Sequence, residues 1–302
     1  MLNPIKRLTD ESFKGFEKKM SDGFKNAVVI CLSQYLAHKC VSIQVRVAFR
    51  AGNRYRKRCG ATPELRLIRL IFRIKDMNID PFSLYCTPTF FINSDHEKII
   101  AFSARHAGPS DNPVKKAVSI FYAVRDQIRY DPYKIPNHQE GFKASRVLAE
   151  GKGFCVSKAV LLAACLRAQS IPARLGFANV KNHLTTPKLR EKMGTDLFEW
   201  HGYTDIFLEE KWVKATPTFN LSLCQNFGVL PLEFNGREDS VFHPFDAKGQ
   251  QHMEYVQDHG YFADLPWDRL MTAYRSAYPR YFESGGISGD FNAEAKELHP
   301  NK

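Results

Sequence analysis

The amino-acid sequence predicts an α+β fold in which most of the helices precede the strands. Two stretches carry this prediction: 112–130 has apolar residues at helical spacing, and 197–208 alternates between apolar and polar residues. The chain has 302 residues, of which 44% are hydrophobic, so it can bury a sizeable core in one large domain or two small ones. No run of about 18 apolar residues occurs, so no transmembrane helix is predicted.

The predicted helices lie between residues 112 and 170. The segment 112–130 opens with Asn112 as a cap and with a proline near the first turn. The segment 143–151 is a short helix that ends at Gly151. The segment 154–170 is apolar on nearly every side, which predicts a central, buried helix that ends before Pro172.

Strands follow these helices, and two of them form a predicted hairpin across the two-residue turn Glu209-Glu210. With this turn, the numbers of paired residues sum to 419, so Thr218 faces His201. Beyond the hairpin, 221–283 is rich in aromatic and loop residues, and 284–302 is polar and predicted to be a flexible tail. The three predicted strands are 173–180, 197–208 and 211–219.

The positive charge of the chain is concentrated at its start, because residues 1–75 hold 17 of the 43 Lys and Arg but only 5 of the 32 Asp and Glu. One interpretation is a basic arm for nucleic acid or an anionic membrane surface. The preferred one is an extension that is disordered or lies upstream of a true start at Met77. The predicted organisation is a basic extension over 1–76, one domain over 77–283 and a flexible tail over 284–302.

The seven cysteines are widely spaced, without a CxxC pair or a zinc-ligand spacing, which predicts reduced thiols in a cytoplasmic protein. A cluster of acidic and histidine side chains near the C-terminus matches no metal-ligand spacing and is interpreted as polar loop residues. That cluster consists of His243, Asp246, His252, Glu254 and His259.

Cys155 differs from the other cysteines because it stands at the first turn of the predicted buried helix. There a sulfur meets the positive end of the helix dipole and free N–H groups, both of which favour the thiolate. The flanking Gly151 and Gly153 let the backbone approach a substrate closely, and the N–H of Cys155 could serve as an oxyanion donor. His201 is the candidate base: it lies on the more polar face of its strand, and Thr216 is diagonal to it on that face.

The segments around these residues resemble the transglutaminase-like superfamily. The run "ASRVLAEGKGFCVSKAVLLAACLRAQSIPARLGF" is similar to the nucleophile region of that family, and "HGYTDIFLEEKWVKATPTF" is similar to its His strand, turn, Trp and Asp-Pro-Thr block. The resemblance covers 77–283, is most specific over 144–219 and is closest to bacterial transglutaminase-like cysteine peptidases. It implies a papain-like fold in which the Cys-bearing helix packs on an antiparallel sheet.

The resemblance implies that Cys155 is the nucleophile and His201 the general base, while Thr216 stands at the family's Asp position. Thr216 is a departure, because a threonine hydroxyl accepts a hydrogen bond but supplies no charge. Cysteine chemistry tolerates a neutral orienting group, since thiolate and imidazolium stabilise each other. Other candidates for this role are Asp196, Asp205 and Asn220, and the segment 129–133 is expected to form part of the cleft wall.

The function that the resemblance implies is acyl transfer at amide bonds of a protein or peptide through a thioester, with no metal or cofactor. Water as acceptor gives hydrolysis of a peptide or glutamine amide, and an amine gives transamidation. An alternative is a catalytically inactive protein of the same fold that binds or scaffolds, of which Thr216 is the mark. A third is a nucleic-acid-associated protein that works through residues 1–76 and binds in a salt-dependent way.

Overall fold

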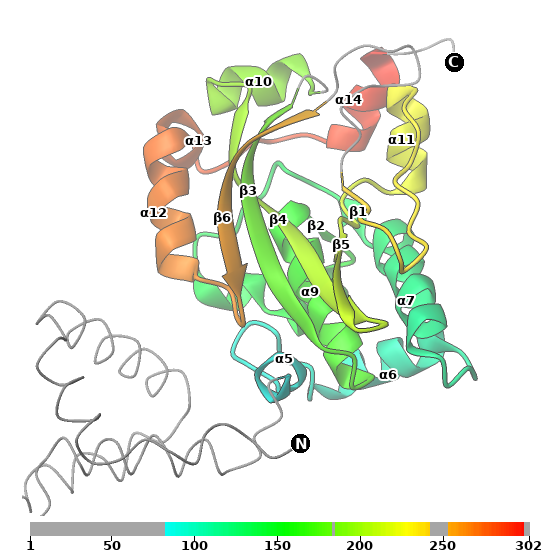
Figure 1. Ribbon diagram of the computed structural model, residues 1–302. Coiled ribbons are helices and arrows are strands. Elements are labelled where there is room, and N and C mark those ends of the chain that lie inside the picture. The colour runs from blue at the N-terminus through cyan, green and yellow to red at the C-terminus, as the bar shows by residue number, and fades with distance from the viewer. Residues whose placement is uncertain (1–81, 183–184, 242–252, 299–302) are drawn as a thin grey trace, which may run out of the picture. The chain divides into compact units, whose positions relative to one another are not determined.

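The computed structural model of the chain describes residues 82–182, 185–241 and 253–298 (Figure 1). These residues lie in the second of two units, Ile79–Lys302. The predicted basic extension, 1–76, and three members of the polar cluster, His243, Asp246 and His252, lie outside the described residues. None of the described helices is long and apolar enough to cross a membrane.

The helices of the first half gather around the predicted central helix, α9 (Cys155–Ala168). Every residue from Cys155 to Arg167 is buried, because this helix has no polar face to turn toward water. Asn112 caps α7 by accepting a hydrogen bond from the Lys115 N–H at 3.1 Å, and Gly151 ends α8 in a left-handed conformation. The helices are α5 (Ser83–Cys86), α6 (Glu97–Ala107), α7 (Pro113–Gln127), the 3-10 helix η2 (Gln139–Phe142) and α8 (Ala144–Glu150).

The strands form one antiparallel sheet in the order β5-β4-β3-β6, together with a small parallel pair, β1-β2. One face of the sheet packs against α9, where the Thr204 hydroxyl donates to the Ala159 carbonyl at 2.9 Å. The predicted α+β fold, with its Cys-bearing helix on an antiparallel sheet, is therefore confirmed. The strands are β1 (Arg129–Tyr130), β2 (Lys152–Gly153), β3 (Ala173–Asn182), β4 (Leu197–Leu208), β5 (Lys211–Ala215) and β6 (Met253–Phe262).

The hairpin of β4 and β5 has the predicted register, which runs from Leu208↔Lys211 to Thr204↔Ala215. Both residues of its turn, Glu209 and Glu210, have positive φ angles of 46° and 64°, as two-residue hairpin turns with the right twist require.

The predicted third strand, 211–219, is wrong in its second half, because β5 ends at Ala215. Pro217 has no N–H to continue the ladder, and the Thr216 N–H bonds instead to the Ser240 carbonyl at 3.0 Å. The pairing of Thr218 with His201 is therefore absent from the β4–β5 ladder.

The C-terminal part is more regular than its sequence pattern indicates. Residues 284–302 were predicted to be a flexible tail, but α14 lies within them, and its first residue, Phe291, packs against the rings of Tyr130 and Tyr133. These aromatic contacts hold the segment on the domain, although its polar, Gly-rich composition predicts flexibility. The elements after α9 that the sequence pattern did not predict are α10 (Pro187–Met193), α11 (Leu221–Phe227), α12 (Trp267–Ala277), α13 (Pro279–Glu283), α14 (Phe291–Leu298) and β6, and before α9 the pattern did not predict α5, α6, η2, β1 and β2.

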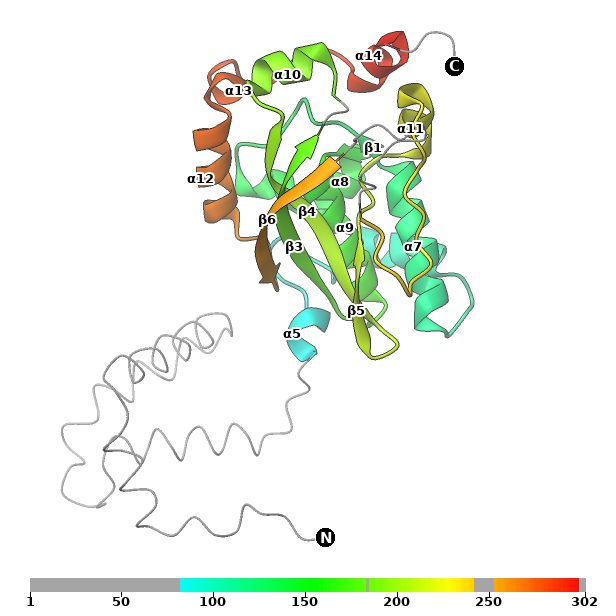
Figure 2. The ribbon, with the colours of Figure 1, turned by 45° about the horizontal axis from the view of Figure 1, so that its top comes forward.

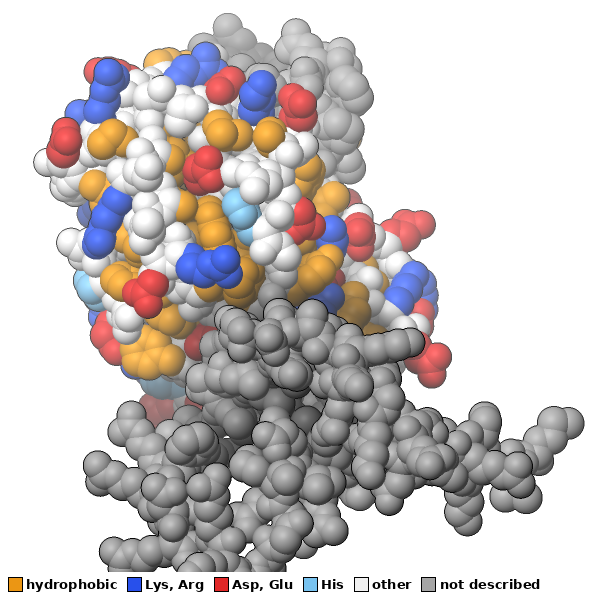
Figure 3. Space-filling view, turned by 60° about the vertical axis from the view of Figure 1, so that its left-hand side comes forward, with side chains coloured by type: hydrophobic (Ala, Val, Ile, Leu, Met, Phe, Trp, Pro, Cys, Tyr) orange, Lys and Arg blue, Asp and Glu red, His pale blue; other side chains and the backbone are white. Residues whose placement is uncertain are grey.

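The later helices flank the sheet rather than cover α9. In both ribbon views α12 and α13 lie on the β6 side of the sheet, and α7 lies on the β5 side (Figures 1 and 2). On the face seen in Figure 3, apolar side chains lie between interspersed basic and acidic ones. The N-terminus of α9 is held between these flanks, which places Cys155 inside the molecule.

Candidate active site

Cys155 is the first residue of α9, and the strand β4 approaches it closely at Gly202. A Cβ atom on Gly202 would lie 2.9 Å from the Cα of Val156, so only glycine fits this approach. On the other side, β2 places Gly153 beside Tyr130 in a parallel pair. The first turn of the helix is thus enclosed by β4 and by the β1-β2 pair.

Three backbone N–H groups converge on the sulfur of Cys155: its own and those of Val156 and Gly202. These donors lower the pKa of the thiol, as the helix N-terminus was predicted to do. Burial is the larger effect and raises the pKa to about 11, because the side chain is only 7% exposed. The resting form is therefore the neutral thiol, and the predicted thiolate is not its ground state.

His201 lies in β4, one residue before the Gly202 N–H that reaches the sulfur. Its side chain is buried, and burial lowers the pKa of the imidazole to about 3. At neutral pH both members of the predicted pair are uncharged. The structure thus places the backbone next to His201 beside Cys155, in an environment where burial disfavours the charged form of both side chains.

A local irregularity sets the position of His201. The preceding residue, Trp200, has a φ of 51°, and the β3–β4 register shifts between Ala178, which pairs with His201, and Val180. The Trp200 ring stacks on His259 with centroids 4.4 Å apart. Such bulges re-aim side chains and are common beside active sites.

Thr216, the residue at the family's Asp position, is buried, and its hydroxyl makes no hydrogen bond within the described part of the chain. The same is true of Thr218, two residues on. Both hydroxyls could accept or donate a hydrogen bond, and leaving such a group unsatisfied costs about 1–3 kcal/mol. No hydrogen bond from Thr216 to His201 supports the predicted orienting role.

The other candidates for the orienting role are engaged elsewhere. Asp205 forms a buried ion pair with Arg174 at 2.7 Å, and Asp196 is exposed. Asn220 uses its side-chain oxygen to accept the Tyr130 N–H at 3.0 Å. None of these three contacts involves His201.

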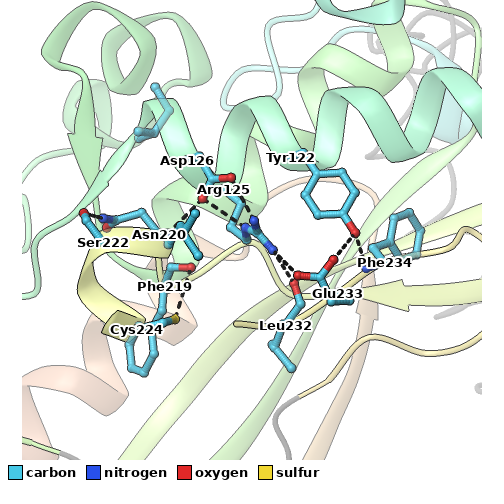
Figure 4. Close-up of polar contacts among 12 residues, drawn as sticks. Tyr122, Arg125, Asp126, Phe219, Asn220, Ser222, Cys224, Leu232, Glu233 and Phe234 are labelled. Atoms are coloured by element: carbon cyan, nitrogen blue, oxygen red, sulfur yellow. Dashed lines mark hydrogen bonds and ion pairs between the residues drawn. The ribbon is translucent and has the colours of Figure 1, made fainter. Parts of the chain in front are cut away.

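Asn220 belongs to a polar network that holds β1 in place (Figure 4). Arg125 in α7 donates to the carboxylate of Asp126 and to the carbonyl of Leu232, both at 2.8 Å. Asp126 accepts the N–H of Leu221 at 2.9 Å, which fixes the start of α11 next to Asn220. The network is structural support for Tyr130.

Lys158, one turn after Cys155, is a second buried anchor that the sequence analysis missed. Its ammonium donates to the carbonyls of Arg125 and Ile128 at 2.8 and 2.5 Å, so it ties α9 to the end of α7. Burial lowers the pKa of this lysine to about 7. A lysine inside an otherwise apolar helix was the signal that could have identified it.

Three tyrosines outside the predicted site interact electrostatically with Cys155. Burial is the largest cause that raises the pKa of Tyr130, Tyr274 and Tyr278, and a charge on Cys155 raises each of these pKa values further. The Tyr274 hydroxyl donates to the Trp200 carbonyl at 3.4 Å. The Tyr278 hydroxyl accepts the Glu199 N–H at 2.5 Å. Two of the three are therefore committed to the strand that leads to His201.

The described residues contain no group of His, Cys, Asp or Glu side chains that could hold a metal ion. His259 of the polar cluster contacts the Asn179 side chain at 2.7 Å in addition to its stacking on Trp200. The described cysteines, Cys86, Cys155, Cys165 and Cys224, form no disulfide.

A comparison with known protein families finds the family that the sequence resembles. Residues 100–217 match the model of the Transglutaminase-like superfamily, whereas no curated protein matches the chain.

Two solved structures are similar to the chain at 18% identity. The first is a "Putative Cysteine Protease" from Cytophaga hutchinsonii, with a TM-score of 0.37. The match covers 62% of this chain and 56% of that protein's chain. The second is a "Putative Protease" from Parabacteroides distasonis ATCC 8503, with a TM-score of 0.29. The match covers 39% of this chain and 22% of that protein's chain. Neither likeness assigns an activity to this chain.

Proposed function

Because residues 100–217 belong to the transglutaminase-like superfamily, we propose that the chain is a cysteine-dependent enzyme that transfers acyl groups from amide bonds through a thioester. The observation that carries the proposal is the convergence of three N–H groups on the sulfur of Cys155, one of them from the residue after His201. The proposed substrate is a protein or peptide. The acyl acceptor is water, in a peptidase or amidase, or an amine, in a transglutaminase.

In the acylation step, the sulfur of Cys155 attacks the carbonyl carbon of the amide and its proton passes to His201. The new C–S bond forms as the carbonyl π electrons move to oxygen, which becomes an oxyanion. His201 then gives the proton to the amide nitrogen, the C–N bond breaks, the amine leaves and a thioester remains. Water or an amine attacks the thioester in the same way and restores the thiol.

The pKa values favour a proton transfer that accompanies attack over a preformed ion pair. With the pKa of Cys155 at about 11 and that of His201 at about 3, the charged pair is disfavoured in the closed site. A substrate amide brings its own polar groups into the site and lowers the cost of that charge. General base catalysis by His201 therefore belongs to the attack step itself.

The developing oxyanion has backbone and side-chain donors available. The N–H groups of Cys155 and Gly202 already point at the sulfur, beside which the oxyanion forms. The backbone of Tyr130 is fixed on both sides, because its N–H donates to the Asn220 side chain and its carbonyl accepts from the Asn292 side chain, both at 3.0 Å. We assign the hydroxyl of this tyrosine as the side-chain oxyanion donor.

A second candidate function is favoured by one observation, the unbonded hydroxyl of Thr216 at the family's Asp position. Without a carboxylate, nothing at that position stabilises a positive imidazolium. On this alternative the chain is a catalytically inactive binding or scaffolding protein of the same fold.

The test uses p-nitrophenyl acetate, an activated ester that acylates thiols and releases a coloured product. If the proposal is correct, the protein gains one acetyl group on Cys155 and releases p-nitrophenol, and Cys155→Ser abolishes both. His201→Gln should slow the acylation by about 100-fold or more, as loss of a general base does. Equal rates in the native protein and the Cys155→Ser variant would instead support the binding protein.

A further inference from the structure

Two cavities adjoin beside the nucleophile segment, along η2 and α8. One has a volume of about 500 Å³ and lies between α6 and α8. The other has a volume of about 690 Å³ and is bounded by α8, α10, α13 and the loop 284–288. His138 and Arg146 line both cavities, which are therefore adjacent, and the two together are called the basic groove below.

Positive charge gathers in this groove, although residues 77–302 as a whole are close to neutral. Two carboxylates also line it, Glu140 and Glu150, and each already forms an ion pair with a groove cation, at 2.9 and 2.7 Å. The cations that line the groove are Lys98, Lys134, Lys143, Arg146, Lys188 and Lys192.

Three of these cations, Lys98, Lys134 and Lys192, form no ion pair within the part of the chain that the structure describes. Lys98 and Lys134 are exposed and Lys192 is half-buried, so their ammonium groups are open to a ligand. Several unpaired positive charges along one groove raise its electrostatic potential and attract an anionic ligand.

The wall of the larger cavity is held in a fixed shape. The Tyr281 hydroxyl donates to the Tyr133 carbonyl at 2.9 Å and accepts the Ile135 N–H at 2.7 Å. Gly286, with a φ of 98°, donates its N–H to the Tyr281 carbonyl at 3.0 Å. The groove therefore needs little ordering when a ligand enters, which favours binding.

The groove runs next to the catalytic segment. Gly141 in its wall is followed by Phe142, whose ring packs against that of Phe154 with centroids 5.9 Å apart. Phe154 directly precedes Cys155. Two buried rings therefore connect the wall of the groove to the residue before Cys155.

We propose that the basic groove binds an acidic segment of the polypeptide substrate, with Lys98, Lys134 and Lys192 as the contacts to its carboxylates. The separated ammonium groups suit separate carboxylate side chains, and the two groove carboxylates, Glu140 and Glu150, are already paired with groove cations. The inference rests on the proposed function only in calling the bound polypeptide a substrate, because binding in the groove needs no reaction at Cys155.

The experiment measures binding of a fluorescein-labelled oligo-glutamate peptide to the full-length Cys155→Ser protein by fluorescence anisotropy. The groove variant combines Lys134→Glu with Lys192→Glu. The control combines Lys181→Glu with Lys211→Glu, two exposed lysines outside the groove. Both pairs change the net charge equally, so any binding by the basic residues 1–76 cancels in the comparison.

We expect the groove variant to weaken peptide binding about tenfold or more, while the control changes it less than about twofold. Equal losses in the two variants would overturn the proposal. A single-stranded oligonucleotide that loses more affinity than the peptide in the groove variant would overturn it in favour of nucleic acid.

Catalysis and binding are separable in this design. If the peptide binds the groove but p-nitrophenyl acetate does not acylate Cys155 in the native protein, the proposed enzyme fails and the acidic-segment site stands. If acylation occurs and both charge variants bind alike, the enzyme stands and the groove proposal fails.

Discussion

The backbone N–H of Gly202 donates a hydrogen bond to the sulfur of Cys155. This one contact joins β4 to the first turn of α9, at the residue that directly follows His201. The same close approach removes water from the sulfur, so the pKa of the thiol rises to about 11 instead of falling. At neutral pH the thiol and the imidazole of the proposed pair are therefore both uncharged.

The first prediction concerns alkylation of Cys155 by iodoacetamide, which requires the thiolate. The rate in the native protein should reach half its maximum near pH 11, the pKa that burial imposes. In urea it should do so near pH 8.5, the usual pKa of a free thiol. Peptide mapping by mass spectrometry separates this thiol from Cys165 and Cys224. A native midpoint near neutral pH that depends on His201 would contradict the neutral resting site.

The second prediction separates the oxyanion from the thiol. Acylation of Cys155 by p-nitrophenyl acetate forms an oxyanion, whereas alkylation by iodoacetamide does not. Tyr130→Phe should therefore slow acylation by about 100-fold and leave alkylation unchanged. Tyr122→Phe is the control, because it removes the hydroxyl that bonds Glu233 far from the sulfur. Equal slowing of both reactions would mean that Tyr130 positions Cys155 and does not stabilise the oxyanion.

The elements that carry the predicted site follow from local sequence patterns. The central helix is recognisable because its residues are apolar all round, and β4 because its residues alternate. The structure reproduces the predicted bounds of β4, 197–208, whereas the helix predicted over 154–170 spans Cys155–Ala168. The two-residue turn Glu209-Glu210 then fixes the hairpin register, since strand pairing propagates from a tight turn. These features are set by residues that are close together in the sequence, so the sequence pattern is enough to predict them.

The remaining features of the site depend on contacts between distant residues. The ladder stops before Thr216 because Ser240, 24 positions later, takes its N–H. Cys155 interacts electrostatically with Tyr274 and Tyr278, which lie in and directly after α12, more than 100 positions later in the sequence. The reversal of the expected thiol pKa follows from burial in the folded chain, so no motif around Cys155 could have predicted it.

The third prediction follows from the low pKa of His201. In the unfolded chain this histidine titrates near pH 6.5, but in the folded protein only near pH 3. Between these values the unfolded state binds more protons, so stability falls as the pH falls. From pH 7 to about pH 4.5 the free energy of unfolding should lose about 2–3 kcal/mol through this group. His201→Gln should remove that part of the loss in urea titrations, and His138→Gln, at an exposed position, should retain it. An unchanged pH dependence in His201→Gln would contradict the buried neutral imidazole.

The fourth prediction concerns the enclosure itself. The Tyr278 hydroxyl joins the end of α12 to the strand before His201 through the Leu197 carbonyl and the Glu199 N–H. Tyr278→Phe should lower the free energy of unfolding by about 1–2 kcal/mol and speed alkylation of Cys155 at pH 8.5.

Tyr281→Phe is the matched control for the enclosure, since it also removes a buried hydroxyl that bonds one carbonyl and one N–H. It should cost similar stability without speeding alkylation. If both variants speed alkylation equally, the effect comes from general loosening and Tyr278 has no special role at the site.

The fifth prediction restores the residue type that the family carries at position 216. A carboxylate in Thr216→Asp would stabilise the positive imidazolium, raise the pKa of His201 and thereby favour the thiolate of Cys155. The alkylation midpoint should move down by at least about one pH unit, the usual effect of an adjacent opposite charge. The cost of burying the carboxylate appears as a lower free energy of unfolding.

Thr218→Asp is the control for that variant, because this threonine is equally buried and also has an unbonded hydroxyl. It should lower stability without moving the alkylation midpoint, since position 218 is not the family's Asp position. If neither variant moves the midpoint, residue 216 does not act on the imidazole, and the binding protein becomes the better account. If Thr216→Asp alone moves the midpoint, residue 216 lies where it acts on the imidazole of His201. The residue type at this position then decides whether Cys155 and His201 carry charge.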